Sequence, residues 1–157
     1  MTVGVVGCNR IPDNSMIQNF TTNEAAFVQL RDLFASDSQL TTIRRNLIMS
    51  SGVVLRSPPL DIEGVGLSQE RYSAYVQLLD RLGLEVGVAR SGSGIWFEAQ
   101  GPSFANGAAR KGYIYSDLEL APLVADLDAR VPSNLRRPGE VLFRRLNEHW
   151  YLWLGYD

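Results

Sequence analysis

The side chain best suited to general acid–base chemistry near neutral pH is histidine, and this chain has one, His149. It follows Glu148 at a predicted turn, where a side chain is more often exposed than catalytic. A Ser-His-Asp triad would need it, but Ser91-Gly92-Ser93-Gly94 lacks the Gly-x-Ser-x-Gly spacing of a nucleophile elbow. We therefore predict a chain without catalytic residues, and retain a small hydrolase centred on His149 as an alternative.

Other reactive arrangements have weaker support. Catalysis by cysteine would require Cys8 to meet His149 from the opposite end of the chain, and only the residue types favour that pairing. A glycosidase-like pair of carboxylates needs a separation of about 5–10 Å, which the sequence does not reveal. The carboxylates considered for such a pair are Asp61, Glu63, Glu98, Asp117 and Glu119. No cofactor or metal site is predicted, because the early glycines lack dinucleotide-loop register and one cysteine cannot build a thiolate site.

The only cysteine ends an apolar run, Val5-Val6-Gly7-Cys8. Small or apolar residues before a cysteine are typical of a lipobox, so Cys8 is the predicted lipidation site. The stretch before Val5 is shorter than the roughly 7–15 apolar residues of a signal peptide. Residues 1–20 are therefore predicted to be a truncated signal followed by a polar tether over residues 9–19. In the alternative, residues 3–6 form a buried first strand and Cys8 is a small core residue.

The composition indicates one ordinary domain with a sizeable core. The chain has 157 residues, of which 45% are hydrophobic and 20% charged, and its net charge is −2. This balance argues against disorder and against a nucleic-acid-binding protein, because the arginine pairs at 44–45, 136–137 and 144–145 are separated by acidic residues. No apolar run reaches the roughly 18 residues that span a bilayer, so membrane attachment would depend on a lipid at Cys8.

Three helices are predicted from capping signals and apolar spacing. Residues 21–36 begin with a capping box formed by Thr21 and Glu24. Residues 68–82 begin at the N-cap Ser68 and stop before Gly83, which suits the left-handed position after a helix. A short helix is predicted over residues 120–129, with a proline in its first turn.

Strands are predicted in the remaining apolar segments. Residues 40–55 are expected to hold two short strands around a turn at 50–52, and residues 84–89 and 95–99 to form a hairpin. A further strand is expected at 112–116, and a second hairpin joins 141–146 to 149–156. Together with the helices, these segments predict an α+β domain over residues 21–157: a twisted, mostly antiparallel sheet with two or three helices on one face.

The last predicted strand carries aromatic residues on both of its faces. One set is expected to pack beneath the helices, while the other meets a loop, a partner or a ligand. Because tryptophan and arginine are favoured interface anchors, we predict five partner-binding residues. These are Trp96, Arg136, Arg137, Trp150 and Trp153.

These features together resemble small proteobacterial lipoproteins of uncharacterised function, some of which are immunity proteins. The resemblance is carried by the cysteine after Val-Val-Gly, the polar spacer, Phe27-x-x-Leu30-x-x-Leu33-Phe34, Leu82-Gly83-Leu84, Gly112-Tyr113-Ile114-Tyr115-Ser116 and His149-Trp150-Tyr151-Leu152. It implies a non-enzymatic binding protein, an immunity-type inhibitor of a secreted antibacterial effector, anchored by lipid in the periplasm. The alternatives are an envelope structural or small-molecule-binding lipoprotein, and a cytoplasmic location if Met1 is the true start.

Overall fold

A computed structural model describes residues 10–56, 62–92, 94–102, 109–129 and 139–156. The helices of this part are α1 (Asp13–Ser36), the short 3-10 helix η1 (Glu63–Val65) and α2 (Gln69–Arg81). The strands are β1 (Leu40–Arg44), β2 (Leu47–Ser50), β3 (Val53–Arg56), β4 (Gly87–Ser91), β5 (Gly94–Gln100), β6 (Ala109–Tyr115), β7 (Val141–Arg145) and β8 (Trp150–Tyr156). Within these ranges, no helix has the length and hydropathy needed to cross a bilayer.

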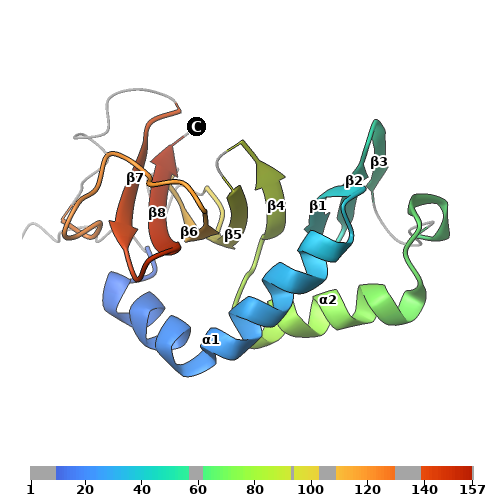
Figure 1. The fold of residues 1–157 in the computed structure, drawn as a ribbon, viewed down its shortest axis with the longest axis horizontal. Helices are drawn as coiled ribbons and strands as arrows, with labels where there is room; N and C mark the ends of the chain where they lie inside the picture. The colour runs from blue at the N-terminus through green and yellow to red at the C-terminus, as the bar shows by residue number, and fades with distance from the viewer. Residues whose placement is uncertain (1–9, 57–61, 93, 103–108, 130–138, 157) are drawn as a thin grey trace, which may run out of the picture.

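All eight strands belong to one antiparallel sheet, in the order β3-β2-β1-β4-β5-β6-β8-β7. Figure 1 shows both α-helices on the same side of this sheet, with α1 running beneath most of its width. The α+β prediction, a largely antiparallel sheet with helices on one face, is therefore confirmed.

The first helix begins at Asp13, eight residues before the predicted domain boundary at residue 21. The tether predicted up to residue 19 is wrong for residues 13–19, because they are helical and their apolar side chain Met16 is buried. The capping signal at Thr21 instead lies next to a kink, where Asn23 leaves helical geometry with φ −118°. Thr21 uses its hydroxyl to donate to the Ile17 carbonyl oxygen at 2.9 Å. Cys8 and the other residues of 1–9 lie outside the described part.

The second helix follows its capping signals closely. The Ser68 hydroxyl oxygen accepts a hydrogen bond from the Arg71 amide at 3.1 Å, which satisfies one of the free amides of the first turn. Gly83 has a φ of +66°, where a residue with a side chain is strained. Tyr75 and Leu79 are fully buried, so the predicted apolar face packs toward the sheet.

The two predicted hairpins are present. β4 and β5 pair from Gly87↔Glu98 to Ser91↔Gly94, and β7 pairs with β8. Asn147 stabilises the second turn, because its side-chain oxygen accepts from the amides of His149 and Trp150 at 3.1 and 3.0 Å. Residues 40–56 form three strands where two were expected, since a turn at residues 45–46 separates β1 from β2.

The third predicted helix is absent, because residues 120–129 contain no helical element. The Phe143 amide donates to the Pro122 carbonyl oxygen at 3.1 Å, and the Val124 amide donates to the Phe143 carbonyl oxygen at 2.8 Å. Leu123 thereby forms a parallel bridge along the outer side of β7. An isolated helix this short is marginal in water, whereas the edge of β7 offers backbone partners.

Aromatic side chains pack on both faces of the sheet, as the alternation along β8 predicts. The helix side holds a large core in which the Phe27 ring centroid lies 4.6 Å from that of Tyr113 and 5.8 Å from that of Trp150. The opposite face holds a smaller cluster consisting of Ile114, Leu120, Phe143, Tyr151 and Trp153. The loop that carries Leu120 therefore helps to cover this second face.

Candidate functional site

Two of the predicted partner-binding tryptophans are core residues, which corrects that prediction. Trp150 is 3% exposed and lies among the rings of the helix-side core, and Trp153 is 4% exposed on the opposite face. The reason is topological: β8 lies between β6 and β7 and is covered on both faces. Trp96 is half-buried, with its ring centroid 5.2 Å from that of Trp153. Arg136 and Arg137 lie outside the described residues.

His149 lies in a partly exposed position beside several polar groups. Its Nδ1 is 3.8 Å from Asp117 Oδ1, and its Nε2 is 3.9 Å from Glu148 Oε2. The buried Ser116 is a close neighbour, because its amide donates to the His149 carbonyl oxygen. However, the Ser116 hydroxyl donates to the Leu118 carbonyl oxygen at 3.1 Å and accepts from the Leu118 amide at 3.0 Å. Ser116, His149 and Asp117 are thus adjacent, but both hydrogen bonds of the Ser116 hydroxyl are made to the main chain of Leu118 in the turn.

The carboxylates considered for catalysis are distributed among ion pairs and solvent. Glu98 is buried and accepts hydrogen bonds from Arg110 at 2.9 and 3.0 Å, while Arg44 lies 3.4 Å away. Glu119 is exposed and pairs with Arg145 at 2.8 Å. Glu63 is exposed, and Asp61 lies outside the described residues. Glu98 is therefore held in a fixed position by the guanidinium groups of Arg110 and Arg44.

A buried ionic cluster forms where α1 begins, and sequence reasoning missed it. Lys111 of β6 has 1% of its side chain exposed, and its ammonium nitrogen lies 2.6 Å from Asp13 Oδ1. The same nitrogen donates to Asp128 Oδ1 and to the Ile11 carbonyl oxygen, each at 2.8 Å. Two hydrogen bonds and a close ion pair with Asp13 therefore surround the buried ammonium group.

Asp13 is the centre of this cluster. Its Oδ2 accepts from Arg144 at 2.7 Å and from the Leu127 amide at 2.9 Å, and its own amide donates to Asp128 Oδ2 at 2.7 Å. Burial alone raises the pKa of Asp13, but hydrogen bonds from Lys111, Arg144 and Leu127 outweigh it, so the net pKa is lowered. The cluster therefore ties the start of α1 to β6, β7 and the loop at Leu127.

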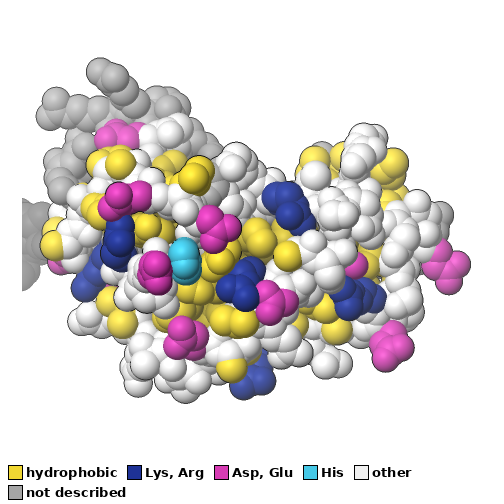
Figure 2. Space-filling model, viewed as in Figure 1, with side chains coloured by type: hydrophobic (Ala, Val, Ile, Leu, Met, Phe, Trp, Pro, Cys, Tyr) yellow, Lys and Arg dark blue, Asp and Glu magenta, His cyan; other side chains and the backbone are white. Residues whose placement is uncertain are grey.

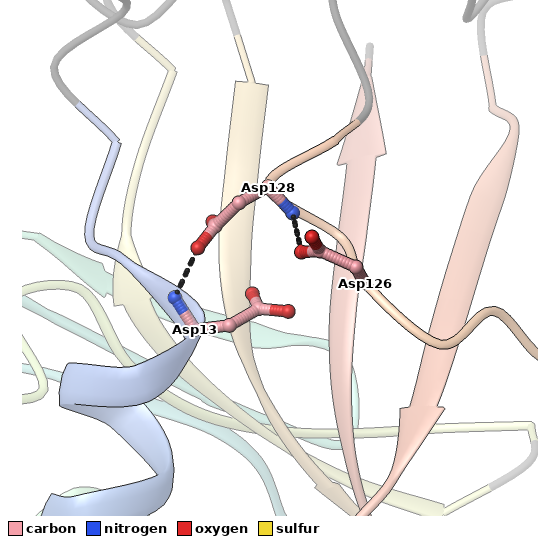
Figure 3. Close-up of side chains that lie close together, drawn as sticks. All are labelled: Asp13, Asp126 and Asp128. Atoms are coloured by element: carbon pink, nitrogen blue, oxygen red, sulfur yellow. Dashed lines mark hydrogen bonds between the residues drawn. The ribbon is translucent and has the colours of Figure 1, made fainter.

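Asp13, Asp126 and Asp128 lie close enough together to resemble a metal site (Figure 3), with one oxygen of each within 4.8 Å of the others. However, Asp13 and Asp128 each direct an oxygen at Lys111. A metal ion at this position would have to displace a buried cation that already balances the carboxylates. We interpret the cluster as a structural ion-pair network that connects the start of α1 to the sheet. A charged Lys111 inside an otherwise buried strand was the one available signal in the sequence.

A surface hollow of about 570 Å³ is the second arrangement of interest. It lies where the C-terminal part of α1 faces the end of β4, the start of β5 and the end of β6. The residues that line it are Arg31, Ala35, Arg90, Ser91, Gly92, Gly94, Ile95, Tyr115, Ser116, Asp117 and Leu118. Figure 2 shows this side of the molecule, where basic and acidic side chains surround patches of hydrophobic surface. The position of Gly94 is constrained, because a Cβ there would overlap the Tyr115 carbonyl oxygen.

Both arginines of the hollow lie over aromatic rings. The Arg31 guanidinium carbon is 4.7 Å from the centroid of Tyr115, and that of Arg90 is 5.0 Å from the centroid of Phe34. Arg90 also donates to the Phe34 carbonyl oxygen at 2.8 Å. The Tyr115 hydroxyl donates to Asp117 at 2.9 Å, which raises the pKa of Tyr115. These contacts restrict the charged groups before any ligand arrives.

The two outer edges of the sheet differ. β7 is lined along its outer side by Leu123 and its neighbours, whereas no strand of the described residues pairs with the outer side of β3. Four large hydrophobic side chains of the described chain are exposed: Val53, Val54, Leu118 and Leu123. Two of these four belong to β3, so this edge offers both backbone hydrogen-bonding groups and apolar surface.

A comparison of the chain with family models gave no match, and neither did comparisons with curated proteins and with solved structures.

Proposed function

We propose that this chain is a non-enzymatic binding protein, an immunity-type inhibitor that occludes a secreted antibacterial effector by pairing with it along β3. The observation that carries the proposal is the outer edge of β3, where Val53 and Val54 are 46% and 47% exposed. The proposed location is the periplasm, with a lipid on Cys8 as the anchor.

An edge strand recognises a partner through its backbone. The free N–H and C=O groups of an edge pair with an extended segment of another chain, and side chains on both faces add apolar contact. β3 pairs with β2 on its inner side, with Val54 opposite Met49 and Val53 opposite Ser50. Successive residues of a strand point to opposite faces, so the exposed valines offer apolar contacts on both faces of an added strand. The occupant we propose is an extended, apolar segment of the effector.

The polar clusters support binding over catalysis. The only histidine is 3.8 Å or more from its acidic neighbours, and the neighbouring Ser116 hydroxyl is engaged by the main chain of Leu118. The buried lysine of the ionic cluster is engaged by two hydrogen bonds and an ion pair, and only 1% of its side chain is exposed. A protein that inhibits its partner by binding alone requires neither a catalytic histidine nor a nucleophilic lysine.

The test uses the full chain and the product of the adjacent gene, expressed together and purified. We expect the two to co-purify, and the activity of the effector to fall when this chain is present. Val54→Lys places a charge on the outer strand and should weaken binding at least about tenfold, because the added strand would have to bury an ammonium group. Leu123→Lys is the matched control, since Leu123 is 45% exposed on the segment along β7.

Three results would contradict the proposal. The first is a wild-type protein that leaves every neighbouring effector fully active. The second is equal binding by the wild type and Val54→Lys, once thermal unfolding shows that both are folded. Loss of binding in Leu123→Lys alone would move the interface to the opposite edge and would also reject β3.

A second candidate function is favoured by the hollow between Arg31 and Arg90. Its volume of about 570 Å³ lies within the range of about 300–1,000 Å³ that small-molecule sites occupy. An envelope protein that binds a small molecule would use such a site. Equilibrium binding of a small ligand by the purified chain, with Val54→Lys as a control that leaves the hollow intact, separates this function from strand pairing.

A further inference from the structure

We propose that the hollow lined by Arg31, Arg90 and Tyr115 is a binding site for a carboxylate attached to an apolar body. This inference goes beyond strand pairing at β3, and it gives the second candidate function a ligand class. The juxtaposition that carries it is two restrained guanidinium groups beside an apolar floor in one cavity.

The charges that line the hollow favour an anion. Two arginines and one aspartate contribute to the lining, which leaves an excess of positive charge. The carboxylate of Asp117 already accepts from the Tyr115 hydroxyl at 2.9 Å. Arg90 has one nitrogen committed to the Phe34 carbonyl oxygen, and its planar fork has further N–H groups. A guanidinium fork matches the two oxygens of a carboxylate, and such charge-assisted bonds are stronger than neutral ones.

Arg31 is positioned from the opposite side of the hollow. It belongs to α1, where Ala35 lies one helical turn further along and also lines the cavity. Its side chain is 24% exposed and pairs with the neighbouring Asp32, which is 61% exposed. An exposed pair between adjacent residues is weak, so a ligand carboxylate can compete for this guanidinium. The contact of Arg31 with the ring of Tyr115, which lines the same cavity, restricts the movement of the guanidinium group.

Ala35, Ile95 and Leu118 add apolar surface to the lining, which favours an anion with an apolar body over a bare inorganic anion. Ile95 is nearly buried at 8% exposure, whereas Leu118 is 64% exposed at the rim. A leucine this exposed gains from contact with an apolar ligand, because the contact removes apolar surface from water. The volume of the hollow accommodates several carbon atoms beside the carboxylate.

Such a carboxylate has two sources: a free small organic acid, or the terminus of a polypeptide that ends in an apolar residue. The experiment therefore titrates the full chain with hexanoate and with N-acetyl-Gly-Gly-Leu bearing a free terminus. Hexylammonium and the amidated tripeptide are the controls without a carboxylate. Binding is followed in ¹H–¹⁵N spectra of the arginine Nε–H groups, which Arg31→Lys and Arg90→Lys assign.

We expect the carboxylate probes to shift the Nε–H signals of Arg31 and Arg90 and the amide signals near Ile95. Arg31→Gln and Arg90→Gln should each weaken binding about tenfold, because each removes a charge-assisted hydrogen bond. Arg45→Gln is the matched control: it also removes one positive charge, but Arg45 pairs with Asp80 away from the hollow.

Every result of this experiment decides the proposal. Binding of hexanoate identifies a free acid, and binding of the free tripeptide alone identifies a polypeptide terminus; both support a carboxylate site. Equal binding of hexylammonium, or equal loss of affinity in Arg45→Gln, overturns it, since the arginines then have no specific role. The absence of any signal shift with every probe at about 10 mM also overturns the proposal, because this concentration fills most sites with a Kd of about 1 mM. None of these results depends on β3, which Val54→Lys tests separately.

Discussion

Replacing Lys111 by methionine is the sharpest test of the buried ionic cluster. Methionine keeps the length and packing of the lysine stem but removes the ammonium group. The substitution leaves the Oδ1 of Asp13 and the Oδ1 of Asp128 without the cation that both contact in the folded protein. Asp13 is 2% exposed, so water cannot replace the lost partner without local opening of the structure.

The size of the effect follows from which contacts survive. Breaking a buried ion pair by removing one partner costs about 3–5 kcal/mol. Arg144 still pairs with the other oxygen of Asp13 at 2.7 Å, and the Leu127 amide still donates to it at 2.9 Å. We therefore expect the lower end of the range, about 3 kcal/mol. In a domain of this size that loss lowers Tm by about 6–12 °C.

The assay is urea and thermal unfolding at neutral pH, followed by circular dichroism. The matched control is Arg145→Met, which also removes a cation from the sheet. Arg145 is 42% exposed and pairs with Glu119, which is 78% exposed, so this change should cost less than about 1 kcal/mol. Equal stability of Lys111→Met and the wild type would refute the reasoning, because it would show that the cluster is solvated.

Acid titration gives this prediction a second readout. The pKa of Asp13 is below 3.8, its ordinary value, so its ionised form contributes stability above pH 3.8. That contribution is lost as the pH falls through the pKa of the folded state. Without Lys111 the pKa of Asp13 rises, so the stability difference between Lys111→Met and the wild type should shrink below pH 3.8. A difference that stays constant down to acid unfolding would contradict this assignment.

Two further predictions concern α2 and the helix-side core. Ser68→Ala removes the acceptor for the Arg71 amide and should destabilise the protein by about 1 kcal/mol in urea unfolding. The control is Ser38→Ala, which replaces another exposed serine and should have little effect on stability. Equal effects of the two substitutions would show that Ser68 does not act as the helix cap. Burial raises the pKa of Tyr113 to about 12 from its ordinary value of 10.0, so its contribution to stability is complete below pH 10.0 and is lost as the pH rises toward 12. Tyr113→Phe should flatten the alkaline part of the stability curve, and an unchanged slope would contradict the assignment.

Several elements of the fold were predictable because their signals are local. Ser68 and Gly83 mark the two ends of α2, since a side-chain acceptor and a left-handed glycine act within one helical turn of the chain. The hairpins were predictable for the same reason, because each turn lies between two apolar segments. The capping signal at Thr21 predicts the wrong helix start, because it lies beside a kink within α1. The helix starts at Asp13, whose amide donates to Asp128, a residue far along the chain.

The candidate sites were less predictable than the elements that carry them. No local pattern pairs Asp13 with Lys111, and none brings Arg31 of a helix over Tyr115 of a distant strand. The tryptophans show the same limit: their types suggested an interface, but the strand order places Trp150 in the core and leaves Trp96 partly exposed.

The sequence by itself determined the class of the fold, the ends of α2 and the turns of two hairpins, because helix caps and turn residues act over a few bonds. Only the tertiary structure decided that the segment around Leu123 lies along β7, that Lys111 is buried, and that no strand of the described residues pairs with the outer side of β3. Burial and ion pairing depend on segments that are distant in sequence, and their positions become fixed only when the whole sheet has formed.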